Sequence, residues 1–173
     1  MKVLVAGLAL WGAVLSASTC AYAQGAKYSC QVLRNIDKVF VVVGRLKPEI
    51  ERDGLYGSIL QKDVELRLSM AGIQVFSEEE AIDGLPVPCL NLDVNAFKYA
   101  DGYVYSIELY LRDRVELLRG RTPIIATIWS IPDSVGITPH LFEIREEAGD
   151  MVDKFVDAWE KVNARSTKED SPR

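Results

Sequence analysis

The stretch Tyr103-Val104-Tyr105-Ser106-Ile107-Glu108-Leu109-Tyr110-Leu111 decides the fold. Every second residue from Tyr103 to Leu111 is aromatic or aliphatic, and a period of two predicts a β-strand with one face turned toward a core. The intervening residues mix aliphatic, polar and charged side chains. We therefore expect the second face of this strand to border solvent, a loop or a partner.

Segments on either side of this strand extend it into a sheet. Apolar and polar residues also alternate over residues 90–97, and Asp101-Gly102 favours a tight turn before Tyr103. After Leu111, Arg119-Gly120-Arg121 with Pro123 indicates a second turn, and residues 124–131 indicate a further strand. Three consecutive strands joined by turns predict an antiparallel meander.

The part of the chain before residue 77 predicts a strand, a helix and a second strand. The β-branched run at 39–43 is typical of a buried strand. Ser58 and Gln61 have the spacing of a capping box, and Gly72 suits the left-handed end of a helix. Between them, apolar residues recur at helical spacing, and residues 73–76 resume an extended pattern. The apolar positions are Leu60, Val64, Leu68 and Ala71.

A long helix closes the chain. Thr138 is expected to cap it, with Pro139 in its first turn, where a missing amide costs nothing. Steps of three and four then place one apolar stripe along the helix: Leu141, Ile144, Ala148, Met151, Phe155, Trp159 and Val162. The whole order predicts a two-layer α+β sandwich, with a mixed, mostly antiparallel sheet of about five strands and two helices on one face.

Residues 1–23 have the features of a cleavable secretory signal. Lys2 precedes a long apolar run, and Ala21-Tyr22-Ala23 offers small residues at a cleavage site before Gln24. A retained anchor is the alternative, but the run is shorter than the roughly 20 residues that span a bilayer. Cys20 raises a lipoprotein alternative, which the preceding Thr19 disfavours. We expect a single domain over 24–164, a flexible polar tail over 165–173, and an exported protein, periplasmic or extracellular.

The charge of the chain narrows the class of partner. Lys2 is the one charged residue in the expected signal, so the mature chain keeps 19 of the 20 basic residues and all 25 acidic ones, a formal charge of about −6. Nucleic acids and anionic membranes attract basic surfaces. We therefore expect neither a nucleic-acid partner nor binding to an anionic membrane surface. Once the apolar run of the expected signal is removed, we also expect no transmembrane segment in the mature chain.

Cys30 and Cys89 are the cysteines that remain after the expected cleavage. In an oxidising compartment, an even pair is interpreted first as a disulfide, which would stabilise the fold by about 4 kcal/mol. Two unrelated buried thiols are the alternative. With no histidine nearby, a zinc site is not expected, and no cofactor is predicted.

No motif in the chain indicates catalysis. His140, the single histidine, lies beside Pro139 at the expected start of a helix and is assigned a capping or surface role. The acidic run 78–80 lacks the spacing of a calcium loop. The favoured hypothesis is a non-catalytic binding protein. The alternative is a small hydrolase whose acid and base are two carboxylates brought together by the fold.

The second face of the central strand is the candidate partner surface. If no loop covers it, its side chains would form a patch of the kind that marks binding surfaces. Arginines near one hairpin end add groups that could grip a phosphate or carboxylate, although a solvated rim is the alternative. The candidate residues are Val104, Tyr110, Arg112, Arg119 and Arg121. The partner would be an envelope protein or a second copy of this chain.

The organisation resembles small exported α/β modules of bacterial envelope machinery. The resemblance rests on element order and on segments such as Gly54-Leu55, residues 63–68 and residues 152–155. Its examples are the lipopolysaccharide-transport lipoprotein, periplasmic domains of curli-secretion-type pores, and lipoproteins that activate cell-wall synthases. It implies an accessory role in envelope assembly and transfers no functional residue to this chain.

Overall fold

The computed structural model describes residues 30–77, 80 and 88–163. The expected signal, Cys20, most of the connection before Cys89 and the polar tail lie outside the described residues. The elements follow in this order: β1 (Lys38–Val43), α2 (Pro48–Arg52), α3 (Gly57–Met70), β2 (Gln74–Val75), β3 (Cys89–Tyr99), β4 (Gly102–Leu117), β5 (Thr122–Ser130), β6 (Ser134–Thr138) and α5 (Leu141–Asn163).

The strands form one mixed sheet in the order β2-β1-β3-β4-β5, with β6 also beside β4. β1 runs parallel to β2 and β3, whereas β3, β4, β5 and β6 pair in antiparallel fashion. β4 is long enough to hold two partners on the same edge. β6 pairs with its first part, Tyr103–Ile107, and β5 pairs with Tyr110–Leu117.

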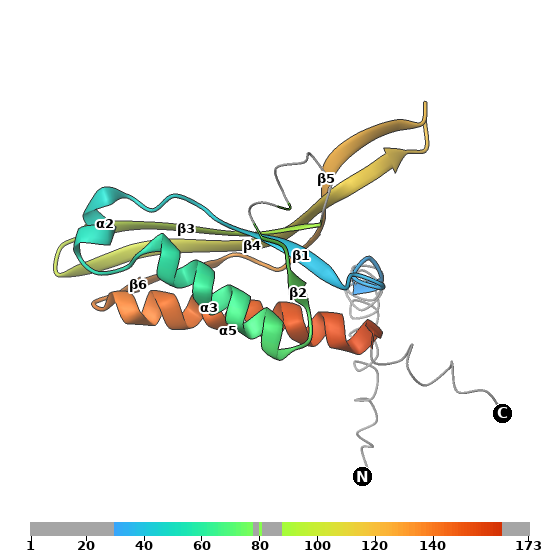
Figure 1. Ribbon diagram of the computed structural model, residues 1–173. Helices are drawn as coiled ribbons and strands as arrows, with labels where there is room; N and C mark the ends of the chain where they lie inside the picture. The colour runs from blue at the N-terminus through green and yellow to red at the C-terminus, as the bar shows by residue number, and fades with distance from the viewer. Residues whose placement is uncertain (1–29, 78–79, 81–87, 164–173) are drawn as a thin grey trace, which may run out of the picture.

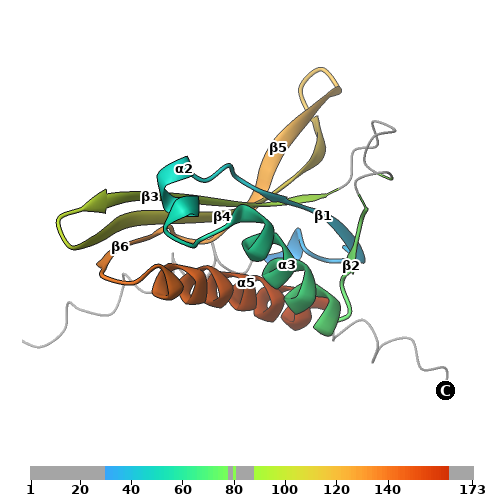
Figure 2. The same ribbon diagram turned by 60° about the vertical axis from the view of Figure 1, so that its left-hand side comes forward.

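The helices cover one face of this sheet, as Figures 1 and 2 show. α3 buries Leu60, Val64 and Leu68 of the predicted stripe, whereas Ala71, its fourth member, is the half-buried C-cap of the helix. α2 contributes Ile50, which is fully buried. The prediction of a two-layer α+β sandwich with a mostly antiparallel mixed sheet is therefore confirmed, with six strands instead of five.

The core lies between α5 and the sheet. Phe155 has no exposed surface and meets Trp129 of β5 edge to face, with ring centroids 5.1 Å apart. Trp159 is half-buried, and its Nε1 donates a hydrogen bond to the carbonyl of Ile36 at 2.6 Å. The predicted stripe of α5 thus packs against the sheet along its length.

Two short elements escaped the sequence analysis. α2 has only five residues and opens with Pro48, and β6 has five residues without a charge. Elements of this length carry too few turns or alternations for a periodic pattern to register. Tertiary contacts form them instead, through Ile50 in the core and pairing with β4.

Both predicted helix starts need correction. The capping box is wrong, because Ser58 lies inside α3, whose N-cap is Tyr56, and Gln61 instead donates to Glu65. α5 begins at Leu141, because pairing with Tyr103 keeps Thr138 extended as the last residue of β6. The Thr138 hydroxyl still accepts a hydrogen bond from the backbone N–H of His140 at 3.1 Å.

β4 and β5 continue beyond the sheet as a two-stranded hairpin that projects from the body (Figure 1). The register between the two strands shifts between Leu111 and Arg112, a bulge that increases local twist and turns the hairpin away. Gly120 and Arg121, with φ of 87° and 52°, make the turn. Pro123 belongs to β5 and not to the turn as predicted.

Candidate binding face

The face of the sheet opposite α3 and α5 carries the second residue set of β3 and β4. We call it the open face and define it by the residues that alternate with the core: Asn91, Asp93, Asn95 and Phe97 of β3, and Val104, Ser106, Glu108, Tyr110 and Arg112 of β4. Asn91 is buried at 6% exposure, with its amide bonded to the Cys89 carbonyl. The other members are half-buried or exposed.

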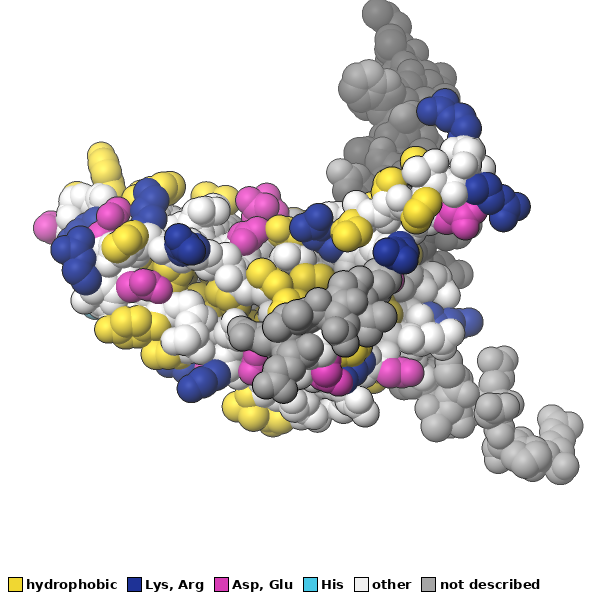
Figure 3. All heavy atoms as spheres, turned by 45° about the horizontal axis from the view of Figure 1, so that its top comes forward, with side chains coloured by type: hydrophobic (Ala, Val, Ile, Leu, Met, Phe, Trp, Pro, Cys, Tyr) yellow, Lys and Arg dark blue, Asp and Glu magenta, His cyan; other side chains and the backbone are white. Residues whose placement is uncertain are grey.

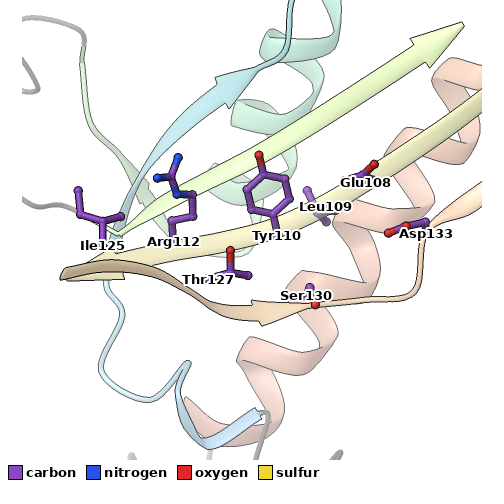
Figure 4. A pocket seen from close by; sticks show the side chains of 8 residues that line it. All are labelled: Glu108, Leu109, Tyr110, Arg112, Ile125, Thr127, Ser130 and Asp133. Carbon is purple, nitrogen blue, oxygen red and sulfur yellow. The ribbon is translucent and has the colours of Figure 1, made fainter. Parts of the chain in front are cut away.

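A shallow hollow of about 570 Å³ lies on this face, where β5 leaves the body and β6 begins (Figure 4). Four of its lining residues come from β4, three from β5, and one from the segment before β6. They are Glu108, Leu109, Tyr110, Arg112, Ile125, Thr127, Ser130 and Asp133. Its wall therefore combines two carboxylates, one guanidinium and three hydroxyls around the edge of an aromatic ring.

Tyr110 is held in place by Asp93 of the neighbouring strand. Its hydroxyl donates a hydrogen bond to Asp93 Oδ2 at 2.8 Å, and this bond raises the pKa of the tyrosine, with burial and the carboxylate charge adding to the effect. Gly44, the residue after β1, leaves room for the Asp93 carboxylate, since a β-carbon at position 44 would lie 2.3 Å from Asp93 Oδ1. The ring thus has a fixed orientation on the open face.

Asp93 and Glu108 are direct cross-strand partners. Because such partners project from the same face of the sheet, the fold brings two carboxylates together from positions that are distant in sequence. Val42 of β1, on the other side of β3, pairs with Asn91 and adds an aliphatic neighbour. Because Asp93 and Glu108 lie side by side, the open face is polar at its centre.

The structure divides the predicted partner surface in two. Val104, Tyr110 and Arg112 share the open face of β4, and the latter two line the hollow. Arg119 and Arg121 lie at the far end of the projecting hairpin and do not reach the hollow. The alternation in β4 places Val104, Tyr110 and Arg112 on one face. The length of the hairpin keeps Arg119 and Arg121 away from them.

Four polar lining residues were missed from the sequence. Glu108 has the same alternation as Tyr110 and could have been found from it. Thr127 and Ser130 could not, because the register shift in β5 changes which of its residues face the same way. Asp133 lies in an irregular segment that no periodicity describes.

The expected disulfide is not formed, because Cys30 and Cys89 are both free thiols. Cys30 packs against the core on the helix side of the sheet. Cys89 precedes Leu90, whose side chain enters the core, so alternation places Cys89 on the opposite side. Burial raises the pKa of the Cys89 thiol.

His140 lies away from the open face, at the start of α5, where its ring stacks on Phe142 with centroids 5.3 Å apart. Glu80, the described residue of the acidic run, forms an ion pair with Lys38 at 2.7 Å. Across the described ranges, no three histidine, cysteine or carboxylate side chains gather as metal ligands. Nor does any helix in those ranges have the length and apolarity to cross a membrane.

Comparison with known proteins identifies no relative. No family model, curated protein or solved structure matches this chain.

Proposed function

We propose that this protein is a non-catalytic binding module that holds a segment of a partner protein on its open face. One observation carries the proposal. Within the described residues, the helices cover a single face of the sheet, while the other face presents a hollow with an oriented tyrosine and an arginine. No described helix covers this second face, so its side chains are available to a partner.

The chemistry of the hollow suits a polypeptide. Tyrosine and arginine are enriched among residues that dominate protein interfaces. Arg112 is exposed and forms no ion pair within the described part of the chain, so its guanidinium is free to bind a carboxylate or carbonyl. Thr127 and Ser130 add hydroxyls that donate to or accept from a peptide backbone.

The shape of the hollow favours a chain segment over a small molecule. Small-molecule sites usually enclose most of their ligand. Here Arg112, Ile125, Thr127, Ser130 and Asp133 are all exposed, so the site is a shallow surface. An extended segment could lie across β4 and β5 without entering a cavity.

The proposed setting is the bacterial envelope. The expected signal over residues 1–23 supports export, and the resemblance of the sequence to envelope-assembly modules supports an envelope setting. An accessory role in envelope assembly, in the periplasm or outside the cell, is consistent with a module that binds a protein and has no nucleophile motif.

Site-specific photocrosslinking tests the proposal. A benzophenone amino acid replaces Thr127 in the hollow, and a control replaces Lys154, an exposed residue of α5. Irradiation of the mature protein in envelope extract should give a discrete adduct only from position 127, and Tyr110→Glu should abolish it. Equal adducts from both positions, or none from position 127, would refute the proposal.

A hydrolase is the second candidate, because the structure places Asp93 and Glu108 opposite one another. Paired carboxylates can serve as general acid and base. The double substitution Asp93→Asn with Glu108→Gln should then abolish turnover of an ester, glycoside or peptide substrate. If wild-type protein turns over none of these classes above the level of the double variant, the binding module stands alone.

A further inference from the structure

A second surface feature lies on the helix side of the molecule, between α3 and α5. We call it the helix groove. It has a volume of about 660 Å³ and is lined by Asp63, Leu66, Arg67, Met70, Ala71, Phe142, Arg145, Glu146, Gly149, Asp153, Val156 and Glu160. Leu66, Met70 and Phe142 are 60%, 80% and 58% exposed. Three large apolar side chains in one groove are a patch of the kind that marks an interface.

The helix groove has more acidic than basic residues in its lining. Arg145 forms a two-pronged pair with Asp63, with Nη2 2.8 Å from Oδ1, and Arg67 pairs with Asp153. These pairs use every basic residue of the lining. Glu146 and Glu160 remain without an ion pair in the described part of the chain. The groove is therefore apolar with excess negative charge.

The far end of the β4–β5 hairpin has the opposite character. We call residues 117–121 the hairpin tip. Leu118 is 98% exposed and Leu117 is 45% exposed, while Arg119 and Arg121 flank the turn. Ile124, on the same face as Leu117, is also exposed. Basic and apolar side chains gather at this projecting end in Figure 3.

The hairpin is basic within an acidic chain. Residues 112–127 contain four arginines and two carboxylates, whereas the whole chain has a formal charge of −5. The one ion pair in the described hairpin joins Arg121 to Glu116, at 3.6 Å between exposed groups. Arg119 forms no ion pair with another described residue, so its guanidinium is available to a carboxylate.

We propose that the hairpin tip of one copy of this chain binds the helix groove of a second copy. Leu117 and Leu118 would contact Met70 and Phe142, and Arg119 would reach the unpaired glutamates of the groove. The hairpin leaves the body on the side away from α3 and α5, so the tip cannot fill its own groove (Figures 1 and 2). Pairing is head to tail, and unlike surfaces that pair in this way can continue into rings or filaments.

Charge favours a second copy over an anionic bilayer as the occupant. A lipid surface would attract the arginines of the tip and accept its leucines. It would also repel the rest of the chain, because the whole chain has a formal charge of −5. In head-to-tail pairing, by contrast, the acidic body is the partner, so the charge asymmetry of the chain assists binding.

This inference does not depend on the proposed function. It uses the hairpin tip and the helix groove, whereas the binding module uses the open face. If the photocrosslinking experiment refutes the binding module, the pairing of hairpin tip and helix groove is unaffected, and the reverse also holds.

Complementation of two variants tests the pairing. Leu118→Asp removes the tip but keeps the groove, and Met70→Asp removes the groove but keeps the tip. Both positions are exposed, so neither change should unfold the chain, which circular dichroism checks. In sedimentation velocity, the wild-type mature protein should assemble with rising concentration. Each variant alone should bind itself at least roughly tenfold more weakly.

An equimolar mixture of the two variants is decisive. It should form a one-to-one dimer that does not grow, because only one intact tip and one intact groove remain. Val135→Asp, a matched change at a residue 73% exposed on β6, should assemble like wild type. Arg119→Glu should weaken assembly, and Glu146→Arg with Glu160→Arg in the second copy should restore it.

Several outcomes would overturn the proposal. A wild-type protein that stays monomeric at high concentration would do so, as would self-association that survives both aspartate variants, which would indicate another interface. Binding of the wild-type monomer to phosphatidylglycerol vesicles but not phosphatidylcholine vesicles, lost in Leu118→Asp, would assign the hairpin tip to a membrane instead.

Discussion

The two faces of β4 differ although their residues alternate along the same stretch, Tyr103–Leu111. On the helix side, Ile107, Leu109 and Leu111 have at most 1% of their surface exposed. On the open face, Glu108 and Tyr110 are only half-buried, and Tyr110 is oriented by a hydrogen bond to Asp93. Apolar burial on the first face supplies folding free energy, so the second face can carry polar and charged side chains.

The contrast continues along the strand. In its first part β4 has partners on both edges and helices beneath it, whereas from Asp113 to Leu117 it is paired only with β5 and projects from the body. The same element therefore serves as the centre of a core and as an exposed arm. The register shift between Leu111 and Arg112 marks the boundary between the two roles.

The largest effect is expected on the covered face. Phe155→Ala should lower the free energy of unfolding by about 3 to 5 kcal/mol, because the ring is fully buried and packs edge to face on Trp129. Chemical denaturation followed by circular dichroism measures the change. A loss below about 1 kcal/mol would mean that α5 does not form the core, and the comparison of faces would fail.

Matched glycine substitutions sharpen the comparison. A β-carbon at Gly136 would lie 2.6 Å from the hydroxyl oxygen of Tyr105 and 2.7 to 2.8 Å from its ring on the helix side, so Gly136→Ala should cost about 1 to 3 kcal/mol. At Gly44 it would meet the carboxylate end of Asp93, which can move, so Gly44→Ala should cost less than about 1 kcal/mol. Equal costs would contradict the idea that only one face is tightly packed.

The third effect is a change in the pKa of Tyr110 more than a change in stability. Asp93→Asn should lower the pKa of Tyr110 toward its ordinary value, because the hydrogen bond to the carboxylate is the main cause of its elevation. NMR of ζ-carbon-labelled tyrosine measures it, with Tyr110→Phe to assign the signal. An unchanged titration curve would show that the two side chains do not meet in solution.

This elevation also has a consequence for stability. A tyrosine with a raised folded-state pKa binds more protons in the native state than in the unfolded state at alkaline pH. Its contribution is complete below about pH 10 and is lost as the pH rises through the folded-state pKa. In the Asp93→Asn variant, the free energy of unfolding should therefore fall less as the pH rises through this range.

The smallest effect is expected from reduction. For the mature chain beginning at Gln24, unfolding free energies with and without dithiothreitol should agree within about 0.5 kcal/mol, because Cys30 and Cys89 are free thiols on opposite sides of the sheet. A native disulfide would instead contribute about 2 to 4 kcal/mol. Alkylation without reductant, followed by mass spectrometry, should modify both thiols after denaturation.

Local patterns in the sequence predicted the long elements and the faces they bury. The stripes of α3 and α5 and the alternation in β3 and β4 were predicted because burial imposes periods of 3.6 and 2 on any chain that forms one core. The same alternation placed Val104, Tyr110 and Arg112 together. The short elements α2 and β6 lacked enough repeats to be found.

What the sequence determined by itself was therefore the class of fold and the side of each long element that faces the core. The tertiary structure alone decided which distant residues meet. Pairing of β3 with β4 brought Asp93 to Tyr110 and Glu108, and the bulge at Leu111 carried Arg119 and Arg121 away from the open face. The reason is physical: periodicity records whether a side chain is buried, whereas strand register and the packing of α3 on α5 depend on the whole chain.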